Sequence, residues 1–273
     1  MCNLKNTKAI FVDIDGTLTN SKKQVTKENA EAIKKAVDKG IFVIICSGRN
    51  FSYAVEKSKK ANASNIVIVS NGAQIYDYSK HQSIYEENMN KNIVKRLVNE
   101  LKKEGVEFIL NTSNTRFGSK GLVRKIDDDE FFFDEIEDIG DEQIVQVVIE
   151  VDDFKTMDKA VKTVEKYDTL QILSLTKAYL EKDFSVKHFY ADVNTKGINK
   201  GKGIKKFLEL YNIKKEEVVC FGDYINDNKM FDECGYKVAM ENASEELKKK
   251  ADYITLSNDN SGVAYFINKF ILD

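Results

Sequence analysis

The 273-residue chain contains no proline, only two histidines and four cysteines without short paired spacing. Without proline, no prolyl isomerisation can limit folding, and loops must be located from Gly, Asn, Asp and Ser alone. His81 and His188 are too far apart in the sequence, and too far from the acidic motifs, for a catalytic triad or a histidine metal site. The cysteine spacing excludes the usual zinc patterns, so we expect free thiols in a reducing compartment.

Long apolar runs and an excess of one charge are also missing. No window of about 18 apolar residues exists, so no membrane span is expected, and the segment before Asp13 is too polar for a signal peptide. Lys+Arg 42 against Asp+Glu 44 gives a net charge of -2, which predicts no nucleic-acid partner and no anionic membrane. The 42% hydrophobic and 32% charged content predicts a globular cytoplasmic protein. We expect a monomer or a weak homo-oligomer.

Strand-like apolar runs alternate with amphipathic helical stretches in the first part of the chain. Thr26 is a good helix N-cap, and Gly40 is a good helix end. The predicted strands are residues 9–12, 41–46 and 66–69, and the helices between them are 26–40 and 51–61. Strands and helices that alternate at this spacing predict a doubly wound parallel α/β sheet.

The alternation breaks in the middle of the chain and resumes near its end. Mixed helices and short strands predict an inserted α+β domain, including a strand at residues 178–180 and a core anchor at Phe131–Phe133. A helix at 200–211 and a strand at 218–221 return to the α/β pattern. We therefore predict a catalytic core from residues 1–82 and 188–273, and an inserted cap from residues 83–187.

Two carboxylates follow the first predicted strand in the segment DIDGTLT. Ligands of open α/β sheets bind at the carboxyl ends of the strands. Asp13 and Asp15 at that edge repel each other and are costly to bury unless a cation neutralises them. A hard cation such as Mg²⁺ prefers such oxygen ligands and commonly accompanies phosphate. The segment therefore predicts a metal-assisted site for a phosphate group.

Three further segments place suitable groups at the same edge. Ser47 ends the second strand in CSGR, where its hydroxyl and the turn amides at Gly48 and Arg49 can bind phosphoryl oxygens. A lysine in the glycine-rich segment GINKGKG can stabilise phosphoryl charge, and the residues alone leave Lys200 open against its neighbours at 196 and 202. The segment GDYIND follows a later strand and supplies Asp223 and Asp227, with Asn226 between them.

Together these motifs resemble the four motifs of the haloacid dehalogenase superfamily of phosphotransferases. The segments NGA at residues 71–73 and NSGVA at residues 260–264 resemble its Cof-type branch, in which a type IIB cap follows the third strand. The resemblance implies that Asp13 is the nucleophile that forms an aspartyl-phosphate and that Asp15 is the general acid/base. It favours Lys200 as the motif lysine.

The resemblance also implies a cofactor and a substrate class. The implied Mg²⁺ ligands are Asp13, Asp15, Asp223 and Asp227. The implied substrate-binding residues are Ser47, Gly48, Arg49, Asn71, Lys200 and Asn226. The leading hypothesis is a Mg²⁺-dependent phosphatase for small phosphate monoesters, with sugar phosphates as the expected class. The alternatives are a hexose-phosphate mutase and a non-catalytic sugar-phosphate sensor on the same fold. An assay that distinguishes isomerised product from free phosphate separates the mutase from the phosphatase.

Overall fold

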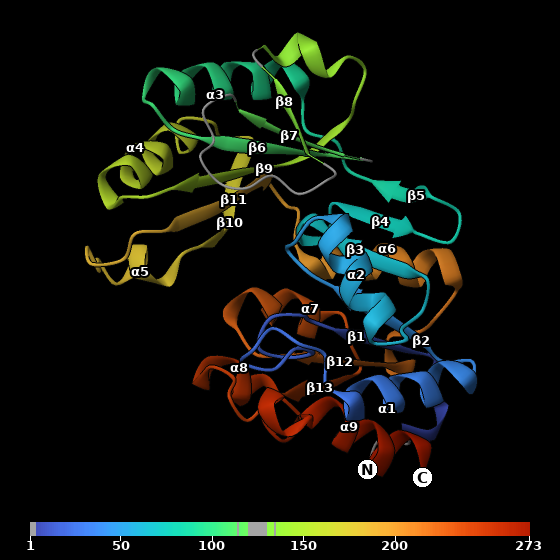
Figure 1. The fold of residues 1–273 in the computed structure, drawn as a ribbon. Helices are drawn as coiled ribbons and strands as arrows, with labels where there is room; N and C mark the ends of the chain where they lie inside the picture. Colours follow the sequence, from blue (N-terminus) through green and yellow to red (C-terminus); the bar gives the residue numbers. More distant parts are fainter. Residues whose placement is uncertain (1–3, 114, 120–129, 134) are drawn as a thin grey trace. The chain divides into compact units, whose positions relative to one another are not determined.

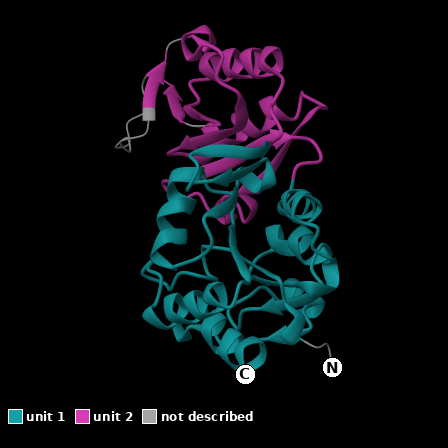
Figure 2. Ribbon diagram, turned by 90° about the vertical axis from the view of Figure 1, so that its right-hand side faces the viewer, with its two compact units in different colours: residues 1–85, 199–273 teal, residues 86–198 magenta. Residues whose placement is uncertain are grey.

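The computed structural model describes residues 4–113, 115–119, 130–133 and 135–273. Contacts between Cα atoms divide it into two compact units, residues 1–85 with 199–273 and residues 86–198 (Figures 1 and 2). This division assigns residues 188–198 to the second unit and residues 83–85 to the first, whereas the sequence analysis expected the reverse for both. The reasons are two strands: β11 (Phe189–Thr195) pairs with strands of the second unit, and β5 (Gln82–Glu86) belongs to the sheet of the first.

The first unit is built on an eight-stranded sheet with the order β14-β13-β12-β1-β2-β3-β4-β5. All neighbours from β14 to β3 are parallel, and β4 returns antiparallel to β3. The strands are β1 (Ala9–Val12), β2 (Phe42–Cys46), β3 (Ile66–Val69), β4 (Gln74–Asp77), β5 (Gln82–Glu86), β12 (Val218–Gly222), β13 (Tyr236–Ala239) and β14 (Tyr253–Ile254). The predicted parallel-sheet core is thereby confirmed.

Helices connect these strands and cover the sheet. They are α1 (Lys27–Asp38), α2 (Phe51–Lys60), α6 (Lys200–Tyr211), α7 (Asn228–Asp232), α8 (Glu245–Lys250) and α9 (Gly262–Phe266). Helix α1 begins at the predicted N-cap, because the Thr26 hydroxyl accepts a hydrogen bond from the backbone N–H of Asn29. Helix α1 packs against α9, whereas α6 packs against α7, and α7 against α8.

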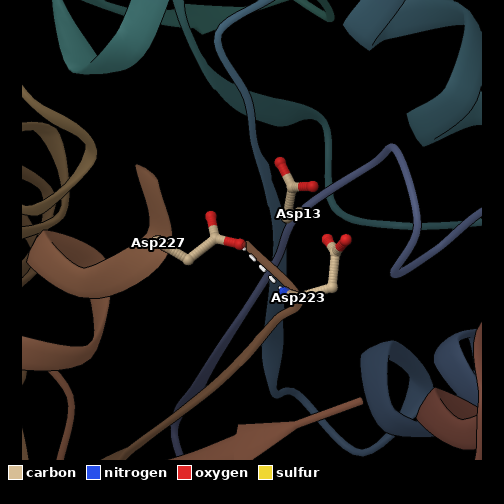
Figure 3. Close-up of side chains that lie close together, drawn as sticks. All are labelled: Asp13, Asp223 and Asp227. Carbon is tan, nitrogen blue, oxygen red and sulfur yellow. Dashed lines mark hydrogen bonds between the residues drawn. The ribbon is translucent and has the colours of Figure 1, made fainter. Parts of the chain in front are cut away.

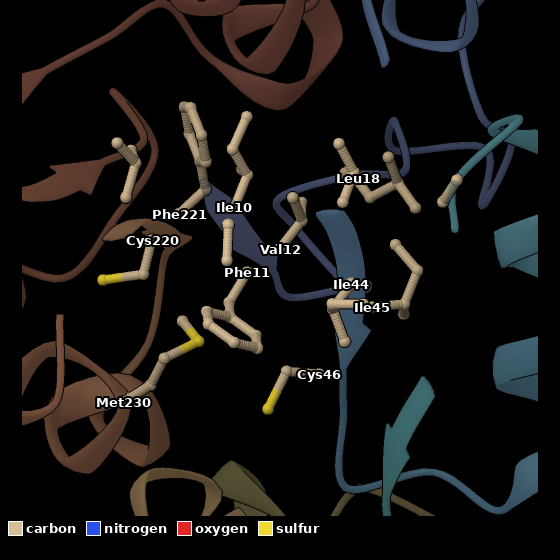
Figure 4. Close-up of a cluster of buried hydrophobic side chains, with 14 of the residues drawn as sticks. Ile10, Phe11, Val12, Leu18, Ile44, Ile45, Cys46, Cys220, Phe221 and Met230 are labelled. Carbon is tan, nitrogen blue, oxygen red and sulfur yellow. The ribbon is translucent and has the colours of Figure 1, made fainter. Parts of the chain in front are cut away.

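The core of this unit lies on both faces of the central strands. Strands β1, β2 and β12 are apolar along their length because neither face meets water (Figure 4). Phe11 on β1 makes an edge-to-face contact with Phe207 of α6 at 5.6 Å between ring centroids. Cys46 and Cys220 are fully buried free thiols in this core, as small apolar residues would be. Such packing holds the carboxyl ends of β1, β2 and β12 in a fixed arrangement.

The second unit is a six-stranded sheet with the order β10-β11-β9-β6-β7-β8, packed against helices. Its strands are mostly antiparallel, and the predicted α+β character is what is found. The elements are α3 (Lys91–Lys103), β6 (Phe108–Thr112), β7 (Arg116–Ser119), β8 (Glu130–Phe133), β9 (Ile144–Val151), α4 (Phe154–Val164), β10 (Leu170–Leu175), α5 (Lys177–Leu180) and β11.

One expectation for this unit was wrong, and another holds only in part. Residues 178–180 lie in the short helix α5 rather than in a strand, because an apolar run of three residues carries no periodicity that separates the two. The aromatic run at 131–133 does not enter the core as a whole. Strand β8 lies at the edge of the sheet, so Phe133 is buried against Phe108, whereas Phe131 and Phe132 are 58% and 51% exposed.

Candidate active site

Three carboxylates converge at the carboxyl ends of β1 and β12. Asp13 follows β1, Asp223 follows β12, and Asp227 ends the short 3-10 turn after it. Each offers an oxygen within 4.8 Å of the others, and Figure 3 shows their side chains close together. The strands are neighbours in the sheet, so residues 13 and 223, far apart in sequence, become adjacent. This carboxylate cluster, Asp13, Asp223 and Asp227, is the centre of the candidate site.

Lys200 lies against the cluster from the first turn of α6. Its Nζ is 2.5 Å from Asp13 Oδ1 and 2.6 Å from Asp227 Oδ1, and its side chain is 1% exposed. The other lysines of the glycine-rich segment do not share this position: Lys196 is exposed and Lys202 is half-buried. Of the three lysines, the structure therefore brings Lys200 to Asp13.

Glycines bring α6 close enough for this contact. A Cβ on Gly72, whose φ is +92°, would lie 2.3 Å from the carbonyl oxygen of Asn199, directly before Lys200. A Cβ on Gly201 would lie 2.2 Å from the carbonyl oxygen of Lys229 in α7. Any side chain at either position would push the helix start away from its neighbours. The glycine-rich segment thus serves helix packing, and that packing places the ammonium.

Asp227 is oriented by donors on both of its oxygens. Oδ2 accepts hydrogen bonds from the backbone N–H groups of Asp223 at 3.0 Å and Tyr224 at 3.2 Å, and Oδ1 accepts from Lys200. Because both carboxylate oxygens of Asp227 already accept hydrogen bonds, this side chain is better suited to hold the turn and Lys200 in place than to bind an ion through both oxygens. Asn226 is half-buried on the same turn.

Asp223 is held from the loop that follows β1. The Thr17 hydroxyl donates to Asp223 Oδ1 at 2.9 Å, and a Cβ on Gly16 would lie 2.4 Å from Asp223 Oδ2. Glycine at position 16, with a φ of +80°, is therefore required both by the turn and by this carboxylate. The sequence analysis missed the role of Thr17. Its position in DIDGTLT, directly after Gly16, could have suggested that role.

The electrostatics of the cluster favour a cation. Burial raises the pKa of Asp13 to about 7; the charge of Lys200 opposes this rise and the charge of Asp227 adds to it. Burial and the charges of Asp13 and Asp227 raise the pKa of Asp223 to about 8. Burial disfavours the Lys200 ammonium, but the two carboxylates raise its pKa above the ordinary value. Among the described residues, Lys200 forms ion pairs with two of the three carboxylates, Asp13 and Asp227, so one ammonium faces three carboxyl groups.

This donor set fits a hard divalent cation. Carboxylate oxygens are the ligands that Mg²⁺ prefers, and a cation between Asp13 and Asp223 would hold both ionised near neutral pH. The carboxylate of Asp15 is not part of the cluster. Its Oδ2 accepts from Arg49 Nε at 3.0 Å, and both side chains are partly exposed. The geometry thus supports Asp13 and Asp223 as carboxylate ligands and does not support the Asp15 carboxylate.

The remaining predicted residues lie at the ends of β2 and β3. Ser47 is 2% exposed, and its Oγ accepts from the backbone N–H of Arg49 at 3.2 Å. Its carbonyl accepts from the backbone N–H of Asn71 at 3.1 Å, which ties the two strand ends together. Gly48 is half-buried between Ser47 and the exposed Arg49. Asn71 is buried, with a left-handed backbone at φ 59°.

Comparison with known proteins identifies this arrangement. A model of the haloacid dehalogenase-like hydrolases matches residues 10–267. The chain is 31% identical over 268 residues to the 5-amino-6-(5-phospho-D-ribitylamino)uracil phosphatase YcsE of Bacillus subtilis, covering 97% of this chain and 96% of that protein. It is 31% identical over 267 residues to a phosphoglycolate phosphatase of Methanobrevibacter smithii, covering 98% and 100%.

Comparison with a solved structure points to the same family. The subclass IIB sugar phosphatase BT4131 superposes with a TM-score of 0.77 at 26% identity, covering 97% of this chain and 99% of that one. The parallel sheet with acidic residues at its carboxyl ends, together with these relatives, defines the protein as a hydrolase. The chain belongs to the haloacid dehalogenase-like hydrolases. Within that family it is a Cof-type, subclass IIB phosphatase, a phosphoric monoester hydrolase. No helix in the described ranges is long and apolar enough to cross a bilayer.

Proposed function

We propose that this phosphatase is Mg²⁺-dependent and hydrolyses small phosphate monoesters, with sugar and polyol phosphates as the preferred class, through an aspartyl-phosphate on Asp13. The observation that carries the proposal is the cluster of Asp13, Asp223 and Asp227, with the buried Lys200 between Asp13 and Asp227. The named substrates of the relatives support the class, because a phosphoribityl group, phosphoglycolate and a sugar phosphate are all phosphate esters of short polar molecules.

In this mechanism Asp13 attacks the phosphorus atom, and the bond from phosphorus to the leaving-group oxygen breaks. Asp15 protonates that oxygen and afterwards takes a proton from the water that hydrolyses the aspartyl-phosphate. Arg49, which holds the Asp15 carboxylate, would orient it between these steps. Bound Mg²⁺, held by Asp13 and Asp223, would neutralise charge on the phosphoryl oxygens.

Lys200 and the strand ends complete the site. The Lys200 ammonium compensates charge on Asp13 and on the phosphoryl group as it is transferred. The Ser47 hydroxyl and the amides at Gly48 and Arg49 would donate to phosphoryl oxygens, with Asn71 and Asn226 at the edge of the site. We assign substrate discrimination to the second unit, as the cap, since the first unit supplies every group proposed to act on phosphorus.

A panel of phosphate monoesters, assayed for phosphate release with Mg²⁺ and with EDTA, tests the proposal. We expect Mg²⁺-dependent release, fastest with sugar or polyol phosphates. The Asp13→Asn variant serves as the blank. If no ester in the panel yields phosphate, or if a labelled hexose phosphate yields its isomer in place of phosphate, the proposed reaction is wrong.

Asp223→Ala should raise the Mg²⁺ concentration needed for half-maximal rate by at least about tenfold, or abolish activity, because it removes an oxygen ligand. Asp232→Ala, an exposed carboxylate on nearby α7, is the matched control and should behave as the wild type. An unchanged Mg²⁺ requirement in Asp223→Ala would show that the ion is held elsewhere.

Asp15→Asn should accumulate phospho-enzyme when nitrophenyl phosphate is the substrate. Nitrophenolate leaves without acid assistance, so Asp13 is still phosphorylated, whereas water activation is lost. Labelled protein in acid-quenched samples is the measurement, and Asp13→Asn under the same conditions should carry no label. Failure to trap the intermediate would mean that the roles of the two aspartates are assigned incorrectly.

A further inference from the structure

Three asparagine side chains hold the loop that follows β1. Asn242 Nδ2 donates to the carbonyl of Gly16 at 2.8 Å, Asn29 Nδ2 to that of Leu18 at 3.0 Å, and Asn258 Nδ2 to that of Thr19 at 2.9 Å. The donors come from three separate segments, two of them more than 200 residues away in sequence, and their acceptors lie within four consecutive residues. Asparagine side chains thus supply the hydrogen-bond donors for three backbone carbonyls of this loop.

Two of these asparagines are joined to each other. The backbone N–H of Asn258 donates to Asn242 Oδ1 at 2.9 Å, so the turn after β13 and the turn after β14 act on the loop together. Asn258 is 7% exposed, whereas Asn242 lies at the surface. We call Asn242 and Asn258 the asparagine brace. Asn258 lies two residues before the segment NSGVA (residues 260–264), which has no role among the catalytic groups described above.

The braced loop in turn contacts a proposed metal ligand. Gly16 lies against Asp223 Oδ2, and the Thr17 hydroxyl donates to Asp223 Oδ1. Gly16 is therefore fixed by Asn242 through its carbonyl while its Cα lies against the Asp223 carboxylate. A shift of this loop would displace the carboxylate or break its bond to Thr17.

We propose that the asparagine brace positions Asp223 for binding a divalent cation, through the loop of residues 16–19. Asn242 and Asn258 are positioning residues, since neither is among the groups that touch the reacting atoms. The inference rests on the proposed function only for its effect on turnover. Its effect on cation binding can be measured whether or not the protein hydrolyses a given ester.

Asn258→Asp is the sharpest variant. It keeps the shape of the side chain and the backbone N–H that bonds to Asn242, but it replaces the Nδ2 donor by a carboxylate oxygen facing the Thr19 carbonyl. A donor–acceptor pair becomes two acceptors, and the loop must move or the new carboxylate must turn away. Asn260→Asp is the matched control, because Asn260 lies on the same 3-10 turn, is exposed and donates only locally, to Ser257 Oγ among its described contacts.

Mn²⁺ is a suitable probe, because it prefers the same octahedral oxygen ligands as Mg²⁺ and free Mn²⁺ is quantified by electron paramagnetic resonance. We expect Asn258→Asp to weaken Mn²⁺ binding by about tenfold, the range seen when groups supporting metal ligands are lost, and Asn260→Asp to change it by less than about twofold. Asp223→Ala identifies the signal as that of this site. In the phosphatase assay the Mg²⁺ requirement should rise in parallel, and added Mg²⁺ should restore most of kcat.

Native affinity for Mn²⁺ in folded Asn258→Asp, even with a lowered unfolding temperature, would overturn the proposal and leave the brace a purely structural feature. If Asn258→Asp does not fold, Asn242→Ala decides, because this exposed residue can be truncated without opening the core and its loss frees the Gly16 carbonyl. Unchanged Mn²⁺ binding there overturns the proposal as well. If the wild type binds Mn²⁺ but hydrolyses no ester, only the proposed function is wrong. If the wild type does not bind Mn²⁺, both the proposed function and the role of the asparagine brace are wrong.

Discussion

Asp13→Asn is expected to lose at least about 10³-fold in kcat with every ester, because a carboxamide is a poor nucleophile and its phosphoryl adduct cannot form. The substitution also removes one of the two charged ligands proposed for Mg²⁺. Phosphate release should be measured at saturating substrate and Mg²⁺. Acid-quenched samples with labelled substrate should show phospho-enzyme for the wild type and none for the variant.

The fold should survive this change. Asparagine is isosteric with aspartate, and burial already disfavours the ionised form of Asp13, whose pKa is raised to about 7. An unchanged circular dichroism spectrum would therefore accompany the lost activity. Asp232→Asn, at the surface of α7, controls for the loss of a carboxylate as such. A residual rate above about one per cent of the wild type would remove Asp13 from the role of nucleophile.

Lys200→Ala is expected to lower kcat by about 10²- to 10³-fold, the size of effect seen when one fixed donor to developing charge is removed. The ammonium contacts Asp13 and Asp227, and because its side chain is 1% exposed, its charge acts on both carboxylates with little screening by solvent. Leaving these buried carboxylates without their partner also costs about 3 kcal/mol of stability. Rates must therefore be compared per folded molecule, well below the unfolding temperature.

The same glycine-rich segment offers two controls for Lys200. Lys196→Ala removes an exposed cation before the helix, and Lys202→Ala removes a half-buried one from its first turn. Both should keep rates within about threefold of the wild type, as is usual for cations that meet solvent. Equal losses in all three variants would show that the segment acts through its net charge and that Lys200 has no special position.

The architecture of the first unit could be predicted because strong local patterns agree with the tertiary structure. Strands buried on both faces are continuous apolar runs, and capping residues such as Thr26 define helix starts. Local patterns failed in the second unit. Residues 178–180 are too few to show a period, and the exposure of Phe131 follows from the place of β8 at the sheet edge.

The sequence by itself determined which chemical groups stand at strand and helix ends, because those positions follow from local patterns: Asp13, Ser47, Lys200 and Asp223. Tertiary structure alone decided which of these groups meet. It separated the Asp15 carboxylate, paired with Arg49, from the carboxylate cluster, and it recruited Asn242 and Asn258 to the loop after β1. Distances between residues remote in the chain depend on strand order and on the close approach of helices, and neither quantity is encoded in any short stretch of sequence.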